Sequence, residues 1–314
     1  MPRTIFLGTG EIAVSAFRWL LEQGHPVEAL VTQPDRPAGR RRELKPSVLK
    51  SLALEHGVTV FQPERIRDDE ALEVVRKWEP DLIVVMAYGQ ILPQALIDIP
   101  RLGCVNLHAS LLPKYRGAAC IQAAVDAGDR TTGVTLMHVV HKLDAGDVIA
   151  TCEEPILPND TGGSLHDRLA VTAREVLAEG MPMLCVGQAP RTPQAELGEA
   201  TYVPKLERGD GRINWTWEPE RLQRRLRAYD PWPGCWTTYD HGGRKSERIK
   251  IFPARGLAMV AGEPGELVAD ADGLVVACGG GGIRLGEVQP DGGRRMDVMD
   301  WWRGFRGDGP KRFD

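Results

Sequence analysis

The chain has 314 residues and a formal net charge of −4, with 42% hydrophobic and 26% charged residues. This length exceeds one average hydrophobic core, so we expect two domains. No apolar run reaches the roughly 20 residues that cross a bilayer, and the net negative charge disfavours a protein that binds nucleic acid over its whole surface. Six scattered cysteines without a Cys-x-x-Cys pair predict neither a zinc site nor a disulfide framework, and we expect a cytoplasmic protein.

The first half of the chain alternates strand-like and helix-like segments. Several of the strand candidates are nearly continuous apolar runs, which are typical of a parallel sheet buried on both faces. Such an alternation predicts a doubly wound, mostly parallel, Rossmann-like α/β domain. The expected strands are Thr4–Gly8, Val27–Thr32, Val58–Phe61, Asp81–Ala87, Val105–His108 and Gly133–Val140, and the expected helices are Ala13–Gln23, Val48–His56, Asp68–Trp78, Gly117–Ala127 and Ser164–Gly180.

The turn Gly8-Thr9-Gly10 follows the first strand and invites comparison with a dinucleotide-binding fingerprint. The third glycine of that fingerprint is missing, because Ala13 and Val14 occupy the region where it belongs. We therefore interpret these glycines as a tight strand-to-helix turn and disfavour a nicotinamide enzyme.

The composition changes after the last of these helices. The proline-rich stretch Gly187–Gln194 begins an extended linker, and beyond it the sequence predicts one helix, Pro219–Ala228, and short strands separated by glycine-rich turns. Short strands with frequent turns indicate a small β-barrel that resembles an oligonucleotide-binding (OB) fold. We expect domains at 1–189 and 209–314 with a linker at 190–208, and strands at Ile249–Phe252, Gly265–Ala269, Leu274–Cys278 and Ile283–Val288.

Asn106 and His108 carry the clearest chemical signal. Side chains alternate along a strand, so these two residues project from the same face at a strand end. Asp144 follows the next strand candidate, and the carboxyl ends of neighbouring strands meet at one edge of a sheet. An amide, an imidazole and a carboxylate together can bind a carbonyl oxygen and move a proton. For Asn106 and His108 alone, a pair of hydrogen-bonded polar residues at a strand end is an equally good interpretation. A Ser-His-Asp hydrolase is disfavoured, because Ser110 lies in no Gly-x-Ser-x-Gly turn.

A dense group of cations follows the second strand candidate, in a connection longer than an ordinary strand-to-helix loop. It could bind nucleic-acid phosphates, although a solvated basic loop is the alternative. Its members are Arg36, Arg40, Arg41, Arg42 and Lys45.

Taken together, these segments resemble the methionyl-tRNA formyltransferases nearly from end to end. The Asn-x-His pair with its later Asp is shared by all folate-dependent formyltransferases, whereas the Thr-Gln-Pro-Asp loop, the linker end and the second domain narrow the resemblance to the tRNA enzymes. The blocks that carry it are Thr32-Gln-Pro-Asp-Arg-Pro-Ala-Gly39, Met86-Ala-Tyr-Gly-Gln-Ile-Leu-Pro93, Asn106-Leu-His-Ala-Ser-Leu-Leu-Pro-Lys-Tyr-Arg-Gly117, Thr132-Gly-Val-Thr-Leu-Met137, Leu143-Asp-Ala-Gly-Asp147, Ala200-Thr-Tyr-Val-Pro-Lys205 and Asp230-Pro-Trp-Pro-Gly234.

The resemblance implies transfer of a formyl group from 10-formyltetrahydrofolate to the α-amine of methionine on initiator tRNA, without a metal and without a membrane, by a protein that we expect to be a monomer. It implies that Asn106, His108 and Asp144 are catalytic. The folate would be bound by Met86, Ala87, Tyr88, Gly89, Ile91, Leu92, Ser110, Leu111, Leu112 and Pro113, and the tRNA by Arg36, Arg40, Arg41, Arg42, Lys45 and Lys205. Four arginines of the later helix could contribute to tRNA binding or only cover a solvent face: Arg221, Arg224, Arg225 and Arg227.

Some positions depart from the family pattern. Gly10 and Cys120 stand where proline is usual, Arg41-Arg42 follows Gly39-Arg40 where the family commonly returns to glycine, and Pro46 lacks a second proline nearby. Two other functions stay open at this point. One is a formyltransferase that acts on a sugar-nucleotide amine, and the other is a non-catalytic RNA-binding or folate-sensing protein.

Overall fold

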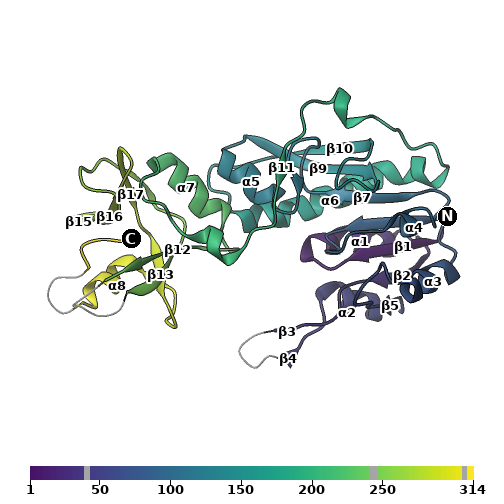
Figure 1. Cartoon of the computed structure of the whole chain (residues 1–314), viewed down its shortest axis with the longest axis horizontal. Helices are drawn as coiled ribbons and strands as arrows, with labels where there is room; N and C mark the ends of the chain where they lie inside the picture. The colour runs from purple at the N-terminus through teal and green to yellow at the C-terminus, as the bar shows by residue number, and fades with distance from the viewer. Residues whose placement is uncertain (39–42, 241–245, 306–309) are drawn as a thin grey trace. The chain divides into compact units, whose positions relative to one another are not determined.

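The computed structural model describes residues 1–38, 43–240, 246–305 and 310–314, and the chain divides into two compact units (Figure 1). The first unit comprises Met1–Cys120, Thr131–Pro155 and His166–Val203. The second comprises Ile121–Arg130, Ile156–Leu165 and Pro204–Asp314. Within the described ranges, no helix has the length and apolar character to span a membrane.

The first unit is built on a seven-stranded sheet with the order β10-β9-β7-β6-β1-β2-β5, whose edge strands β10 and β5 are labelled in Figure 1. Five strands are parallel, and β9 and β10 are antiparallel to their neighbours. The prediction of a doubly wound, mostly parallel sheet is therefore confirmed. The strands are β1 (Thr4–Gly8), β2 (Val27–Val31), β5 (Thr59–Phe61), β6 (Leu82–Met86), β7 (Cys104–His108), β9 (Thr131–His138) and β10 (Val148–Pro155).

Helices and short ribbons complete this unit. A Ser47 hydroxyl caps α2 by accepting from the Lys50 N–H at 3.2 Å, and α3 has acidic residues in its first turn and basic residues in its last turn, as the helix dipole favours. The elements are η1 (Glu11–Ala13), α1 (Val14–Glu22), α2 (Val48–Glu55), α3 (Asp69–Lys77), α4 (Gln94–Ile97), η2 (Gln194–Glu196), β3 (Pro37–Ala38), β4 (Glu43–Leu44), β8 (Arg116–Gly117) and β11 (Tyr202–Val203), with α6 (Gly162–Cys185) lying mostly in this unit.

The chain order changes direction between β1 and β6. From β1 the chain adds β2 and β5 on one side, and it then returns to add β6 and β7 on the other. Such a switch point opens a crevice at the carboxyl ends of the strands, where doubly wound proteins bind ligands. The turn after β1 lies there as predicted, since β1 ends at Gly8 and a helical turn begins at Glu11.

The second unit carries two four-stranded antiparallel sheets, β12-β13-β18-β19 and β14-β17-β16-β15, which confirms a small antiparallel β domain. It also includes α5 from Ile121 onward. The Asp126 carboxylate of this helix accepts from two guanidinium nitrogens of Arg225 in α7 at 2.9 and 2.7 Å. The bounds are α5 (Cys120–Ala127), η3 (Arg208–Gly211), α7 (Pro219–Ala228), β12 (Cys235–Tyr239), β13 (Glu247–Ile251), β14 (Gly256–Ala258), β15 (Leu267–Asp270), β16 (Gly273–Cys278), β17 (Gly281–Arg284), β18 (Glu287–Pro290), β19 (Met296–Asp297) and α8 (Val298–Arg303).

Candidate active site

Strand β7 carries Asn106 and His108 into the middle of the sheet. It pairs in parallel with β6 and antiparallel with β9, so that Asn106 lies opposite Met137 and His108 opposite Thr135. His108 is buried with 7% exposure, while Asn106 is half-buried. The alternation along β7 puts both polar side chains on one face, as the sequence predicts.

Asp144 reaches this face from the loop between β9 and β10. Its Oδ2 atom lies 3.7 Å from Nδ1 of His108 and accepts a hydrogen bond of 2.8 Å from the backbone N–H of Gly117. Asp144 itself has a left-handed backbone with φ of 48°. The structure thus brings together His108 and Asp144, which are 36 positions apart in the sequence.

The second ring nitrogen of His108 defines its protonation. Nε2 lies 2.9 Å from the carbonyl oxygen of Tyr115, and because a carbonyl can only accept, Nε2 must carry a proton. Burial disfavours the charged ring, but the Cys120 sulfur and then the Asp144 carboxylate outweigh it and raise the pKa of His108 to about 9. The raised pKa favours the imidazolium form of the ring. The contact with Cys120 could not be anticipated from the sequence.

The Tyr115 carbonyl is held by a tightly bonded loop, residues 110–117. The Thr135 hydroxyl donates to the Ser110 carbonyl at 2.7 Å and accepts from the Leu112 N–H at 3.0 Å. The Ser110 hydroxyl donates to the Lys114 carbonyl at 2.7 Å. Tyr115 has a left-handed φ of 61°. These bonds fix the loop that presents an acceptor to His108.

The predicted folate residues follow the carboxyl ends of β6 and β7, which are neighbouring parallel strands. Those that present surface are Ala87, Gly89 and Ile91, which are exposed, and Leu92 and Leu111, which are half-buried. The other five have buried side chains that pack beneath the surface of the two loops: Met86, Tyr88, Ser110, Leu112 and Pro113.

The first of these loops lies at the switch point of the sheet. Ala87 and Gly89 have positive φ values of 49° and 86°. The backbone N–H of Gly10 donates to the Ala87 carbonyl at 3.3 Å, and the Thr9 hydroxyl donates to the Tyr88 carbonyl at 3.2 Å. A proline at position 10, which is usual in the family, would lack this N–H. Gly10 therefore allows a hydrogen bond to the Ala87 carbonyl that proline could not make.

The predicted tRNA-binding residues are only partly described. Arg36 and Lys45 are exposed in the first unit, and Lys205 is exposed in the second. Arg40, Arg41 and Arg42 lie outside the described residues.

The start of this basic segment is anchored by a polar network. Lys50 pairs with Asp35 and donates to Gln62 Oε1 at 2.7 Å, while Gln62 donates to Asp35 at 2.9 Å. The hydrogen bond from Lys50 is the main cause that lowers the pKa of Asp35. Asp35 therefore stays ionised and tied to α2.

The arginines of α7 largely serve the second unit itself. Arg225 is paired with Asp126 as described above, Arg224 donates to the Asp126 carbonyl at 3.0 Å, and Arg227 donates to the Asp160 carbonyl at 3.0 Å. Arg221 stacks on the Trp217 ring at 3.8 Å. All four side chains left undecided by the sequence are thus engaged in contacts within the second unit.

A different surface of the second unit combines cations with aromatic rings. Arg248 stacks on the Trp236 ring at 4.0 Å, and Arg212 lies 6.0 Å from the same ring. The Arg208 guanidinium is 6.0 Å from the ring of Trp232, which is exposed. Stacked rings beside cations suit the bases and phosphates of RNA.

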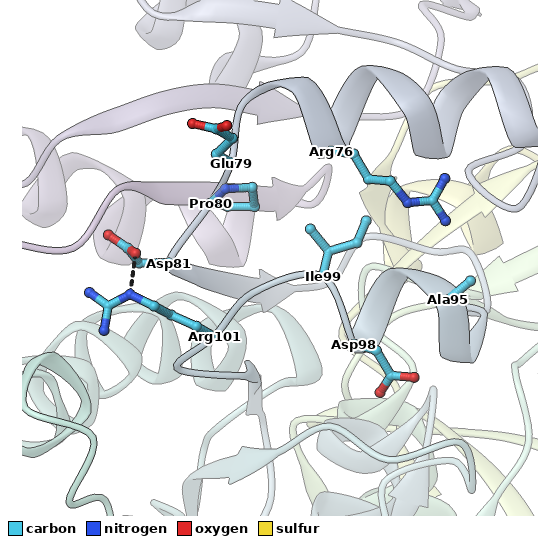
Figure 2. A pocket seen from close by; sticks show the side chains of 8 residues that line it. All are labelled: Arg76, Glu79, Pro80, Asp81, Ala95, Asp98, Ile99 and Arg101. Atoms are coloured by element: carbon cyan, nitrogen blue, oxygen red, sulfur yellow. Dashed lines mark hydrogen bonds and ion pairs between the residues drawn. The ribbon is translucent and has the colours of Figure 1, made fainter.

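A hollow of about 740 Å³ lies away from these residues. Figure 2 shows its lining, in which Arg101 points to Asp81 and pairs with it at 2.6 Å. Asp81 precedes β6, so the hollow is at the amino end of that strand, whereas the candidate site follows the carboxyl ends. It is lined by Arg76, Glu79, Pro80, Asp81, Ala95, Asp98, Ile99 and Arg101. No group of His, Cys, Asp and Glu suited to a metal ion is found in the described ranges.

Comparison with known proteins identifies the family of this chain. Residues 2–181 match the formyl transferase family and residues 205–306 match the formyl transferase C-terminal domain. Methionyl-tRNA formyltransferases of Akkermansia muciniphila and Methylococcus capsulatus are 48% and 46% identical, over 94% and 95% of this chain and 94% and 96% of theirs.

Two solved structures share the fold at lower identity. HypX from Aquifex aeolicus in complex with tetrahydrofolic acid superposes with a TM-score of 0.65 at 19% identity, over 100% of this chain and 51% of its own. The N-formyltransferase from Helicobacter canadensis, in complex with folinic acid and dTDP-3-aminofucose, gives a TM-score of 0.63 at 15% identity, over 94% of this chain and 100% of its own.

Proposed function

Because this chain belongs to the methionyl-tRNA formyltransferase family, we propose that it transfers a formyl group from 10-formyltetrahydrofolate to the α-amine of methionine on initiator tRNA. The observation that carries the proposal at the level of the site is the pairing of the buried His108 with Asp144 on the strand face that also presents Asn106.

The reaction places opposite charges on two atoms. The neutral amine attacks the formyl carbon, a new C–N bond forms, and negative charge develops on the formyl oxygen while the attacking nitrogen becomes positive. Asn106 donates its amide N–H to that oxygen. A donor of this kind is worth about 10²–10³ in rate.

His108 supplies the proton. As an imidazolium it stabilises the oxyanion and protonates the departing N10 of the folate when the C–N10 bond breaks, and the neutral ring then accepts the proton that the amine releases. Acid–base assistance of this kind contributes about 10²–10⁴. Asp144 keeps the imidazolium in place and favours its formation, as a carboxylate does in analogous triads.

The residues present fit a reduced folate. When bound, the folate supplies the formyl group from its N10 atom. Ile91, Leu92 and Leu111 offer apolar surface for the pterin, and the left-handed backbone at Ala87 and Gly89 turns peptide groups toward its edge. The buried Met86, Tyr88, Ser110, Leu112 and Pro113 hold this surface from behind.

The tRNA is bound by cations of both units. Arg36, Arg40, Arg41, Arg42 and Lys45 grip acceptor-stem phosphates, and Lys205 contributes at the end of the linker. The exposure of Arg36, Lys45 and Lys205 supports this assignment, as does the Arg and Trp surface of the second unit. The catalytic domain then comprises residues 1–189, the linker 190–208 and the tRNA-binding domain 209–314, in a monomer that works in the cytoplasm.

A sugar-nucleotide amine is the alternative acceptor. Sugar formyltransferase structures that share the fold of this chain are 15% and 23% identical to it, whereas tRNA enzymes among its relatives are 41% and 48% identical over nearly its whole length. A non-catalytic binding protein has no use for a buried imidazolium paired with a carboxylate.

The test is a formyl-transfer assay with three acceptors: methionyl initiator tRNA, methionyl elongator tRNA and a sugar-nucleotide amine. We expect formylation of the initiator tRNA alone. Formylation of the sugar nucleotide instead would overturn the acceptor, and transfer to none of the three would overturn the proposed activity.

A further inference from the structure

The segment after α6, residues 192–203, returns to the candidate active site although the sequence predicts a linker there. Thr192 exchanges two backbone hydrogen bonds with Val148, of 2.9 and 3.1 Å. At its other end, β11 pairs with β8, and the Thr201 hydroxyl accepts from the Tyr115 N–H at 2.8 Å. The segment is thus tied both to the strand that follows the Asp144 loop and to the loop that contacts His108.

Gln194 lies within this segment and is buried with 3% exposure. Its Nε2 donates to the carbonyl oxygens of Asp144 at 2.9 Å and Gly146 at 2.8 Å. Its Oε1 accepts from Nε and Nη2 of Arg116 at 3.0 and 2.7 Å. The amide nitrogen and the amide oxygen of Gln194 therefore both have partners. If the amide were flipped, its N–H groups would face the Arg116 donors and its oxygen would face the two carbonyl oxygens.

Arg116 makes this bridge electrostatic. Arg116 is 7% exposed, and its guanidinium donates to oxygens of uncharged groups, the Gln194 amide and, at 2.8 Å, the Tyr202 hydroxyl. A buried cation polarises the amide that accepts from it, which strengthens the donors at the other end of that amide. Gln194 therefore carries the effect of Arg116 to the backbone of the Asp144 loop.

The Asp144 loop needs such support. Asp144 has a left-handed φ of 48°, which is costly for a residue other than glycine. Gly146 leaves no room for adjustment, because a Cβ atom there would lie 1.7 Å from the His138 carbonyl oxygen. The Gly117 N–H holds the carboxylate, and Gln194 holds the carbonyl groups of Asp144 and Gly146.

We propose that Gln194 is a positioning residue for formyl transfer, which fixes Asp144 against His108 through the Arg116–Gln194 bridge. This inference rests on the proposed function. Gln194 does not touch the reacting atoms, so its removal lowers kcat and leaves the KM values for folate and tRNA nearly unchanged.

Two substitutions separate positioning from packing. Gln194→Met keeps the length of the side chain and adds no charge but removes every polar contact. Gln194→Glu keeps the acceptor for Arg116 and gives that cation a carboxylate partner, but it places acceptors against the Asp144 and Gly146 carbonyls. The matched control is Gln188→Ala, an exposed glutamine just before the segment.

We expect kcat to fall by about 100-fold in both variants, because a displacement of about 1 Å at a catalytic group has that effect. In Gln194→Met the descending limb of the kcat–pH profile moves to lower pH, because a displaced carboxylate supports the His108 imidazolium less. A residue that only fills space would change the melting temperature without moving this limb. Gln188→Ala should match the wild type.

The pKa of His108, followed by NMR titration, gives a readout that does not depend on turnover. A lower pKa in Gln194→Met supports the inference, and a wild-type pKa together with wild-type kcat in Gln194→Glu overturns it. If Gln194→Met does not fold, the kcat of Gln194→Glu tests the inference: a fall of about 100-fold supports it and a wild-type kcat overturns it. Should the wild type itself fail to formylate any acceptor, the proposed function fails, while the NMR titration still tests whether Gln194 positions Asp144.

Discussion

The Nδ1 atom of His108 lies 3.7 Å from Oδ2 of Asp144, and the Gly117 N–H binds that same oxygen at 2.8 Å. The distance is too long for a hydrogen bond but well within the range of an ion pair. The carboxylate is therefore held by the backbone and acts on the ring through its charge. This arrangement favours the imidazolium and leaves the ring free to exchange its proton.

Substitution of His108 should separate chemistry from binding. His108→Ala removes the proton donor, so we expect kcat to fall by about 10²–10⁴, while the Kd for tRNA stays within about twofold of the wild-type value. Single-turnover kinetics and filter binding measure the two quantities. The control is His141→Ala, whose side chain is exposed. Near-normal turnover of His108→Ala would exclude His108 from catalysis.

The raised pKa of His108 predicts how stability depends on pH. Its value of about 9 in the folded protein exceeds the ordinary 6.5, so its stabilising contribution is complete below pH 6.5 and is lost as the pH rises through 9. The loss is on the order of 3 kcal/mol. Urea unfolding at pH 6 and pH 9.5 should show a larger difference for the wild type than for His108→Gln. Equal differences would place the pKa of His108 near its ordinary value.

Cys120 is expected to influence the catalytic ring. Its sulfur is the strongest of the contacts that raise the pKa of His108. Cys120→Ala should therefore lower that pKa and move the descending limb of the kcat–pH profile to lower pH. NMR titration of His108 measures the shift directly, with Cys152→Ala as the control at a cysteine of β10 that is only partly buried. An unchanged titration would show that Asp144 and the Tyr115 carbonyl sustain the imidazolium without Cys120.

Much of the fold follows from local patterns, and the exceptions have physical reasons. The predicted bounds of β1 and α7 agree with the structure, because apolar runs and capping signals are local. Strand β10 is not predicted from the sequence. Only its first two residues are buried, and its edge position exposes alternate side chains such as Glu153, so it lacks the apolar run of a central strand.

A second exception is the predicted strand Ile283–Val288. In the structure it is divided between β17 and β18, which belong to different sheets. Leu285 and Gly286 separate them, and Leu285 is fully buried, so hydrophobicity alone does not mark the break. An apolar run shows that a segment is buried but does not show which sheet it joins.

The candidate site divides in the same way. The spacing of Asn106 and His108 on one strand and the position of Asp144 after the next are readable from the sequence, and the structure places His108 beside Asp144 as expected. The contact with Cys120 and the bridge from Arg116 to Gln194 are not readable, because they depend on tertiary packing. Arg116 and Gln194 are 78 positions apart and meet only once the chain has returned from α6.

Steric limits in the Asp144 loop give a stability prediction. Because a Cβ at position 146 would lie 1.7 Å from the His138 carbonyl oxygen, Gly146→Ala should reduce the free energy of unfolding by about 3 kcal/mol or more. The control is Gly209→Ala, since a Cβ there meets nothing within 4 Å. Urea titrations of both variants measure the difference. A loss below about 1 kcal/mol in Gly146→Ala would show that the loop can relax.

Replacement of Arg40, Arg41 and Arg42 by alanine tests the assignment of the basic segment. Polyanion binding releases counterions, so the logarithm of the tRNA affinity should fall more gently with the logarithm of salt concentration, with a slope reduced by about 2 to 3 if all three arginines contact phosphates. The KM for folate should not change. A matched control replaces three exposed arginines of the first unit, Arg65, Arg67 and Arg76.

Kinetics measured from low to high salt distinguish the outcomes, because a general loss of positive charge would flatten the slope equally in both triple variants. An unchanged slope in the Arg40–Arg42 variant would remove this segment from the tRNA site and leave the second unit, with its Trp236 and Arg248 stack, as the surface to test next.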